Sequence, residues 1–301
     1  MIAAGPTLLV WRRLLRHRLA ELSIGFLVVL LVLALAAPLI ARLRGVDPAM
    51  TDLFSRLQPP SARHWLGTDE LGRDLFQRLL DGGRISLLVG FAGAILSAVL
   101  GAAIGVVAGY LGGRLDGLLM RLTDGVIALP LLPLLIVLAA IDPRKLGIPP
   151  EIAQSETFSL YRLVVIVALT GWTTAARLVR AETLSLKTRD FARAARALGA
   201  SPVRIMFRHI LPNAAGSLVV ATTMSIGSLI LLESTLSFLG LGTQPPAASW
   251  GNMLTGAQDL LRQAPLLALL PGVMIFLTVI AFNFLGDGLQ EALDPRSERR
   301  L

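Results

Sequence analysis

Long apolar runs alternate with polar, Arg-rich segments along the chain. Six of these runs are long enough to cross a bilayer, which takes roughly 20 largely apolar residues in helical conformation. We therefore predict transmembrane helices at residues 22–41, 85–110, 118–141, 160–179, 214–236 and 265–285. Pro130 and Pro133 fall inside the third run, where their missing backbone donors should kink the helix. The predicted fold class is an all-α integral membrane protein.

The first run follows a basic segment at residues 11–18, and the two together could form a cleaved signal peptide. However, the run is long enough to span, and further spans follow it rather than a soluble domain. We therefore interpret residues 22–41 as the first transmembrane helix.

Composition and charge predict where the protein lies in the cell and how it is oriented in the membrane. Hydrophobic residues make up 54% of the chain, and the mean hydropathy is +0.69, as expected for an integral membrane protein. Six spans place both termini on one side. The formal net charge of +8 falls almost entirely on that side, in segments 1–21, 111–121, 177–212 and the tail after 286. Basic loops favour the cytoplasm, so we predict cytoplasmic termini and a multi-pass protein of the cell membrane.

The polar stretch 190–213 has a helical pattern of its own. Apolar side chains recur there with the spacing of one helix face, at Phe191, Ala194, Ala195 and Leu198, and again at Val203, Met206, Phe207 and Ile210. Basic side chains fall on the opposite face of the first helix, at Arg189, Arg193 and Arg196.

Residues typical of helix ends divide this stretch into two helices. Gly199 is typical of the residue that follows a helix C-terminus, and Ser201–Pro202 is typical of a helix start. Pro212 should end the second helix. We therefore predict two short amphipathic helices that dock on a partner.

Two of the predicted spans carry small or hydroxylated residues. A stripe of small side chains runs down one face of the second span, at Gly93, Ser97, Gly101, Gly105 and Gly109. Such a stripe lets a neighbouring helix approach closely, so we interpret it as a packing seam within the chain or with a partner. The fifth span carries hydroxyls at Thr222, Thr223, Ser225 and Ser228. They could hydrogen-bond other helices or line a water-filled translocation path.

Charged residues inside the predicted spans are few. Arg121 and Asp124 are spaced for a local ion pair near the start of the third span. No other acidic residue falls in the middle of a predicted span. This pattern argues against a proton-coupled pump.

The chain offers little catalytic chemistry. It has no cysteine, and its three histidines, His17, His64 and His209, are scattered over separate loops. Metal sites and catalytic triads are therefore poorly supported. Lys187–Thr188 lacks the preceding glycines of a phosphate-binding loop. We predict a non-catalytic protein with no cofactor or metal of its own.

Several motifs resemble those of one transporter family. The segment from Arg193 to Gly199, followed by Ile210–Leu–Pro212, resembles the "EAA" cytoplasmic loop of ABC-importer permeases. Three further stretches are similar to the dipeptide/oligopeptide/nickel group of these permeases: residues 64–74 with 83–90, residues 236–251, and residues 283–296. The resemblance covers nearly the whole chain and identifies it as the C-type partner of two permeases.

The resemblance implies an ABC type I importer permease that works with other subunits. Expected partners are a B-type second permease, two ATP-binding subunits that hold ATP and Mg²⁺, an extracytoplasmic binding protein and membrane lipid, with no nucleic acid. It also implies the residues that dock on the ATPase: Phe191, Arg193, Ala194, Ala195, Leu198, Gly199, Ile210 and Pro212. The family usually has Glu where this chain has Arg193.

The resemblance also implies a division of the chain. Residues 1–84 would form an N-terminal arm, the first span and an extracytoplasmic segment. Residues 85–289 would form a five-helix core with a coupling loop at 187–213, and residues 290–301 a cytoplasmic tail. Residues 64–74 could contact the binding protein or form a solvated cap. The loop 236–250 is open to the same two interpretations. Its Phe238, Leu239 and Leu241 could lie at the membrane surface, with Trp250 as an interfacial anchor.

Two other functions remain open at the level of sequence. A secondary transporter or channel acting without ATPases would predict intramembrane charges or an inverted repeat, and neither is evident. A membrane scaffold would use the Arg-rich loop to bind anionic lipid.

Overall fold

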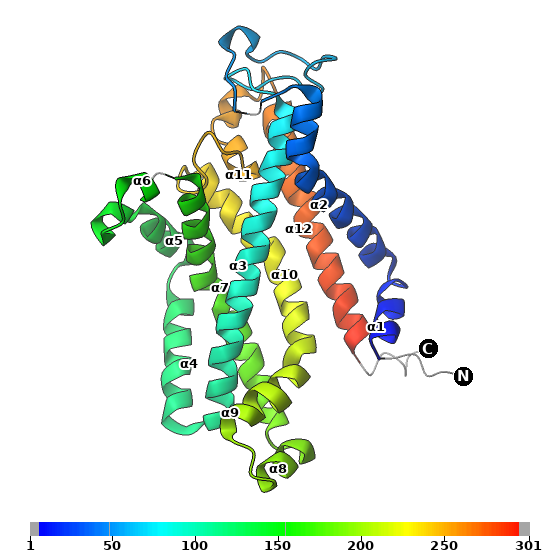
Figure 1. Cartoon of the computed structure of the whole chain (residues 1–301), viewed down its shortest axis with the longest axis vertical. Coiled ribbons are helices and arrows are strands. Elements are labelled where there is room, and N and C mark those ends of the chain that lie inside the picture. The colour runs from blue at the N-terminus through cyan, green and yellow to red at the C-terminus, as the bar shows by residue number, and fades with distance from the viewer. Residues whose placement is uncertain (1–5, 48, 154, 295–301) are drawn as a thin grey trace.

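A computed structural model describes residues 6–47, 49–153 and 155–294 of the chain. These residues form an elongated helical bundle whose long helices run roughly along one axis (Figure 1). The only β pairing among them is an isolated bridge between Thr68 and Asp74. The all-α prediction is therefore confirmed. From residue 295 onward, the predicted tail 290–301 lies outside the described residues.

Five long helices and several short ones make up the bundle. The helices are α1 Pro6–Leu14, α2 Arg18–Arg44, α3 Leu75–Leu111, α4 Gly113–Ala128, α5 Leu131–Ala140, α6 Pro150–Ala153, α7 Glu156–Leu186, α8 Asp190–Ala197, α9 Pro202–Arg204, α10 Leu211–Phe238, α11 Trp250–Met253 and α12 Leu266–Leu293. A π-helical turn, η3 Ile205–Ile210, joins α9 to α10, and short 3₁₀ turns are η1 Leu53–Ser55, η2 Pro143–Leu146 and η4 Ala257–Leu260.

The long helices correspond to the predicted spans. Five helical stretches are long and apolar enough to cross a membrane, and they contain five of the six predicted runs. The remaining run is split into α4 and α5, which meet at an angle of 89°. Pro130 lies at the break and begins α5, so the predicted kink is confirmed and is sharper than a bend. If the bent pair counts as one span, the total is six.

The α3–α7 contact forms the centre of the bundle, and the small-residue stripe of α3 lies in it. A Cβ added at Gly101 or Gly105 would come within about 2.5 Å of backbone oxygens of α7. Ser97 donates a hydrogen bond of 3.4 Å to the carbonyl of Ala168 in α7. The stripe therefore packs against a helix of the same chain, and at Gly101 and Gly105 the helices lie so close that no side chain larger than hydrogen fits.

The hydroxyls of the fifth predicted span bond within their own helix. Thr222, Thr223 and Ser225 donate to carbonyls four residues earlier in α10, and Ser228 is exposed. None of these four side chains therefore hydrogen-bonds another helix within the described chain. The predicted pair of Arg121 with Asp124 is wrong, because Asp124 pairs instead with Arg177 of α7, at 2.5 Å.

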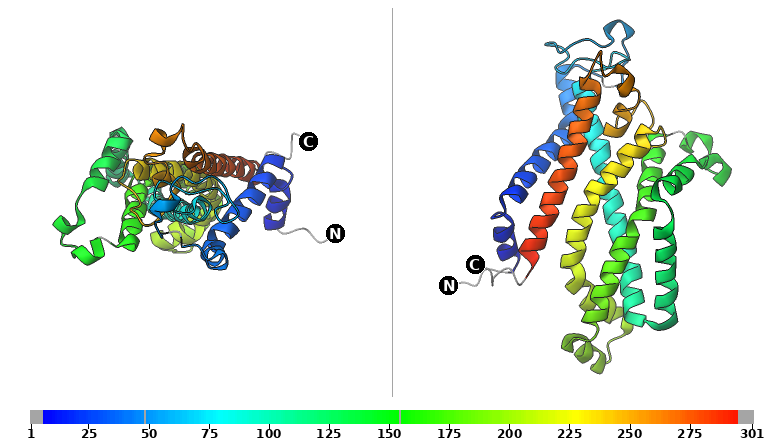
Figure 2. Two further views of the ribbon diagram at one scale, coloured as in Figure 1. Left: turned by 90° about the horizontal axis from the view of Figure 1, so that it is seen from above. Right: turned by 180° about the vertical axis from the view of Figure 1, so that it is seen from behind.

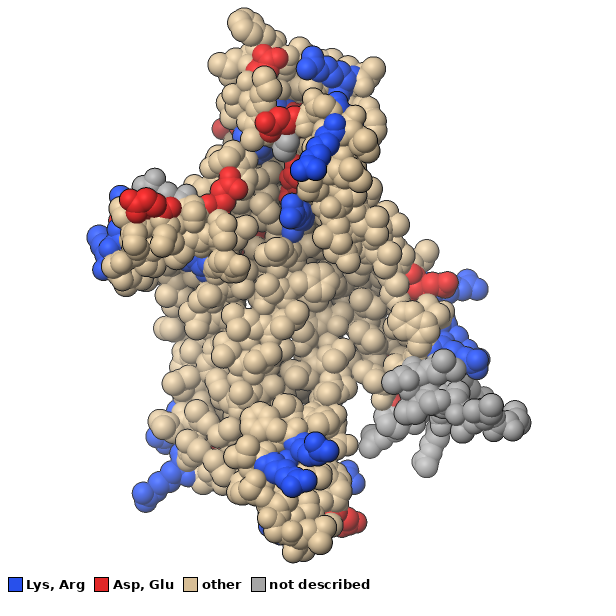
Figure 3. Space-filling model, in the orientation of Figure 1, with Lys and Arg blue, Asp and Glu red and all other residues tan. Residues whose placement is uncertain are grey.

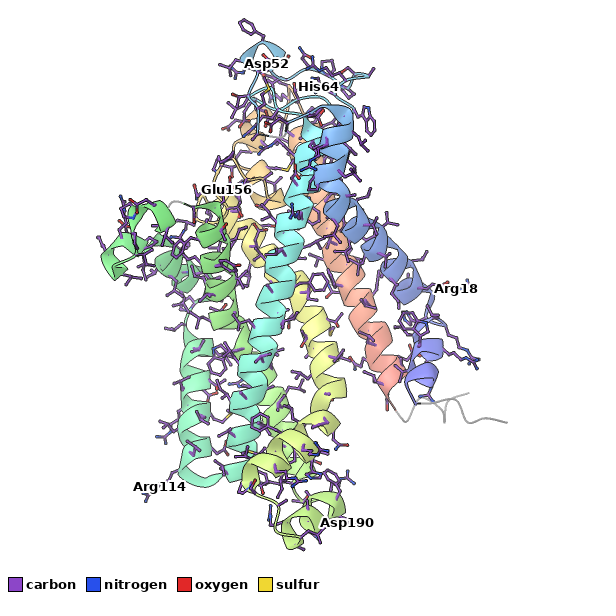
Figure 4. The ribbon with its side chains drawn as sticks, viewed as in Figure 1. Arg18, Asp52, His64, Arg114, Glu156 and Asp190 are labelled. Atoms are coloured by element: carbon purple, nitrogen blue, oxygen red, sulfur yellow. The ribbon has the colours of Figure 1, made fainter. Side chains whose placement is uncertain are left out.

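The opposite end of the molecule from α8 carries a compact polar cap (Figure 4). Asp74 caps α3 by accepting a hydrogen bond of 2.8 Å from the backbone N–H of Gln77. It also accepts two hydrogen bonds from Arg44 of α2. His64 Nδ1 lies 3.0 Å from the same carboxylate. Burial alone would raise the pKa of Asp74, but these hydrogen bonds and the charge of Arg44 outweigh it and hold the pKa below its ordinary value.

Trp250 lies in the interior of this end. Its side chain is fully buried, and its indole N–H donates to the carbonyl of Leu79 at 3.0 Å. Gly82 and Gly83 of α3 leave the space that the indole fills. The prediction that Trp250 is an interfacial anchor is therefore wrong, because a packed pocket with a hydrogen-bond acceptor holds the ring inside the protein.

Candidate functional site

The docking stretch predicted at residues 190–213 lies at one end of the bundle, below the ends of α3 and α7 (Figure 1). Ala192 and Ala195 are the buried residues of α8. Ala195 belongs to a hydrophobic cluster with Val106 of α3, Val179 of α7 and three residues of η3, namely Ile205, Met206 and Ile210. Small residues on α8 thus let it pack closely on η3, and η3 in turn contacts α3.

The turn after α8 has the geometry expected from the sequence. Gly199 has φ +80°, the left-handed conformation that glycine adopts without strain. Its N–H donates to Arg196 O, and the N–H of Ala200 donates to Ala195 O, both at 3.0 Å. This pair of bonds is a Schellman motif, which satisfies the last carbonyls of the helix. Ser201 then caps α9, with Pro202 in its first turn.

The second predicted helix differs from expectation because Pro212 does not end it. The chain continues through η3 into α10, and Pro202–Phe238 is one helical span. The wider π turn precedes the proline, which lacks a backbone donor. The side-chain amide of Asn213 donates to the carbonyl of His209 at 2.6 Å. The stretch is therefore one short helix followed by the start of a transmembrane helix.

The predicted apolar faces of this stretch are divided between inside and outside. Ala195, Met206 and Ile210 point inward, whereas the other apolar residues are exposed. The exposed fractions are 38% for Phe191, 88% for Leu198, 61% for Val203 and 48% for Phe207, and Ala194 is exposed as well. We call Phe191, Ala194, Leu198, Val203 and Phe207 the α8 surface. Apolar side chains gathered on an exposed polar end indicate a protein-binding surface.

Positive charge surrounds this surface. Basic side chains are prominent at this end in Figure 3. Arg193 is exposed, and the Arg196 guanidinium lies 5.7 Å from the ring centre of Tyr110. Lys187, between α7 and α8, donates to the carbonyl of Gly109 in α3 at 2.7 Å. The Arg196 contact ties α8 to α3 and the Lys187 contact ties the end of α7 to α3, so a force on the α8 surface reaches the central helices.

A buried acidic residue near the other end was not predicted. Glu233 lies in α10 rather than in the outer segment 233–262, and it is fully buried. Ser86 of α3 and Ser237 of α10 donate to its carboxyl oxygens, at 2.9 and 2.6 Å. The neighbouring hydroxyls of Ser234, the next residue, and Ser237, one turn further, could have signalled a polar cluster, but the partner Ser86 lies far away in sequence.

Known protein families match this chain along most of its length. The family described as binding-protein-dependent transport system inner membrane component matches residues 101–299. The N-terminal transmembrane domain of oligopeptide transport permease C matches residues 5–60.

Individual relatives extend the likeness to the whole chain. The oligopeptide transport system permease protein OppC of Bacillus subtilis is 36% identical over 280 residues, which cover 93% of this chain and 86% of that relative. The glutathione transport system permease protein GsiD of Shigella flexneri is 42% identical over 286 residues, covering 95% and 89%.

A solved structure has the same fold. The inward-facing MetNI methionine ABC transporter contains a chain that superposes with a TM-score of 0.55 at 19% identity, covering 72% of this chain and 97% of the other. This protein therefore belongs to the family of binding-protein-dependent transport system inner membrane components, and it is a permease subunit of an ABC importer.

Proposed function

We propose that this chain is the C-type permease of an ATP-driven importer of di- or oligopeptides, or of related small solutes. The α8 surface is the observation that carries the proposal, because four large apolar side chains there are between 38% and 88% exposed. Relatives named for oligopeptide and glutathione transport support a cargo of this class.

An importer of this kind needs further subunits. A B-type second permease would complete the path, and two ATP-binding subunits would hold ATP and Mg²⁺. An extracytoplasmic binding protein would deliver cargo. This chain itself would be non-catalytic. Helix-in-groove docking explains why the α8 surface is helical and apolar, with small Ala194 beside larger Phe191 and Leu198.

The proposal fixes an orientation in the bacterial inner membrane. The α8 end would be cytoplasmic, since basic segments favour that side. α1, the start of α2 and the end of α12 pack together through Leu14, Ala20 and Ala292 and would also be cytoplasmic. Residues 1–84 would be an arm, a span and an outer segment, residues 85–289 the core, and residues 290–301 a tail.

Coupling would proceed by rigid-body motion. Closure of the ATPases would move the α8 surface, and the buried cluster of Ala195 with Val106 and Val179 would carry this motion into α3 and α7. Thr222, Thr223, Ser225 and Ser228 remain candidates for the translocation path. Three of these hydroxyls already donate hydrogen bonds within α10, and Ser228 is exposed. All four could therefore still accept a hydrogen bond from water in such a path.

Co-purification combined with transport tests the proposal. The chain, expressed with the genes beside its own, should purify with a second permease and ATP-binding subunits. Vesicles containing that complex and the binding protein should accumulate labelled peptide only when ATP is supplied. A chain that purifies alone and transports without ATPases would instead be a secondary transporter or channel, and the proposal would be wrong.

A further inference from the structure

Asp124 and Arg177 form an ion pair on the outside of the isolated chain. The pair joins α4 to α7, and the two side chains are 59% and 52% exposed. Figure 2 shows α4 beside α7 at the edge of the bundle. More than half of each side chain is therefore left uncovered by the described chain.

The pair lies at the depth of the membrane interior. α10 has no charged side chain from Leu211 to Leu232, a length of about 33 Å that matches the hydrocarbon layer. Ser217, six residues into that stretch, donates to Glu182 of α7 and so marks a common level. Arg177 lies five residues beyond Glu182, so its level is roughly 16 Å along the stretch, inside the hydrocarbon layer rather than in the cytoplasmic segment 177–212 expected from the sequence.

Asp124 is one member of a regular stripe on α4. Residues at helical spacing along one face are charged or small, namely Arg114, Gly117, Arg121, Asp124 and Ala128. We call these five residues the charged stripe. All of them are exposed, and an added Cβ at Gly117 would have no atom within 4 Å. Large apolar residues, such as Leu115 and Leu122, lie on other faces of the helix.

Lipid is a poor neighbour for this stripe. Ionised side chains at membrane depth face either the interior of a bundle or water, because hydrocarbon offers them no hydrogen bonds. A dry helix contact is also unfavourable, because Arg121 makes no ion pair within the described residues and would be buried with its charge unpaired. Water satisfies both the pair and Arg121.

We propose that the charged stripe lines a water-filled part of the translocation path, facing the second permease across it. This inference rests on the proposed function, and it assigns part of the path to α4 and α7 rather than to the hydroxyls of α10. A hydrated wall with both signs of charge suits a zwitterionic peptide, since Arg177 and Asp124 can each offer the opposite charge to one of its ends.

Thiol labelling of the complete transporter tests this placement. The chain has no cysteine, so a single introduced thiol is the only one that it carries. Arg121→Cys lies on the charged stripe, and Leu122→Cys is a matched control at the same depth on another face. A charged, membrane-impermeant thiol reagent is added to vesicles in which peptide uptake is measured. Gly117→Cys serves as a second stripe variant, because its side chain meets open space.

The two faces should differ clearly in reactivity. Only the thiolate reacts, and it forms in water rather than in lipid, so Arg121→Cys and Gly117→Cys should react at least about tenfold faster than Leu122→Cys. Equal or slower reaction at both stripe positions, in vesicles that still import peptide, would overturn the inference alone. Wild-type vesicles that show no ATP-driven uptake would instead overturn the proposed function.

Discussion

Ser86 of α3 donates a hydrogen bond of 2.9 Å to Glu233 of α10, although the two residues lie 147 positions apart. The same serine accepts a hydrogen bond from the backbone N–H of Trp250, at 3.2 Å. Ser237 accepts from the amide of Thr243 while donating to Glu233. Glu233 thus holds α3, α10 and the loop before α12 together.

Removing the Glu233 carboxyl should therefore destabilise the permease. Glu233→Ala leaves the hydroxyls of Ser86 and Ser237 without their buried acceptor, which costs about 1–3 kcal/mol for each group. Glu233→Gln keeps an acceptor and should lose much less. Thermal unfolding of the purified protein in detergent measures the difference.

Thr235→Ala is the matched control for this prediction, because its hydroxyl bonds only to Leu231 in its own helix. It should change stability by no more than about 0.5 kcal/mol. If Glu233→Ala unfolded at the same temperature as Thr235→Ala, Glu233 would not hold these three segments together.

Replacing glycine by alanine should change stability in opposite directions at Gly105 and Gly272, because only Gly105 lies in the α3–α7 contact. Gly105→Ala places a methyl group 2.4 Å from the carbonyl oxygen of Ala176, and separating the helices should cost about 1–3 kcal/mol. Gly272→Ala, in α12, meets no atom within 4 Å and should stabilise by up to about 1 kcal/mol through helix propensity. Unfolding temperatures that shift in the same direction would contradict the close packing.

The cap at Asp74 predicts a dependence on pH. The pKa of Asp74 is lowered in the folded chain, so its ionised form stabilises folding above the ordinary value of 3.8. That contribution is lost as the pH falls through the lowered value. Asp74→Asn should therefore unfold at a lower temperature than wild type at neutral pH, and the gap should close well below pH 3.8.

The control for Asp74 is Asp259→Asn, at an exposed carboxylate of η4. Asp259→Asn should unfold at the same temperature as wild type at neutral pH. An Asp74→Asn gap that stays the same in acid would show that the amide acts through something other than the lost charge.

Some features of this fold could be predicted from the sequence because they are local. The apolar runs, the break at Pro130 and the turn at Gly199 each depend on residues within a few positions. Glu233 and Trp250 could not be placed this way, since their partners Ser86 and Leu79 are more than 140 positions away. Pro212 was misread because a proline ends a regular helix, whereas a π turn before it allows the helix to continue.

The candidate site was predicted in position but not in orientation. Helical periodicity found the apolar residues of 190–213, yet both the packed and the exposed side chains share that period. Ala195 packs in the buried cluster with residues of α3, α7 and η3, whereas Leu198 is exposed. Periodicity along one segment carries no information about which side meets the rest of the chain.

The turn at Gly199 predicts a coupling defect. Gly199→Val strains a φ of +80° by about 1–2 kcal/mol and should alter the path from α8 to α10. ATP hydrolysis by the complex should then continue while peptide uptake falls. Gly240→Val is the matched control, since Gly240 has φ +77° in a similar turn at the other end of α10. Equal loss of coupling in both variants would show that strain alone is responsible.

Peptide uptake by vesicles carrying Leu198→Asp is the most direct test of the docking claim. Leu198 is 88% exposed, so the change leaves the fold intact while placing a charge on the α8 surface. Leu43→Asp, at a leucine that is 78% exposed at the far end of α2, is the control. We predict that Leu198→Asp abolishes ATP-driven uptake and weakens retention of the ATP-binding subunits, while Leu43→Asp preserves both. Wild-type uptake and full subunit retention in Leu198→Asp would contradict the account.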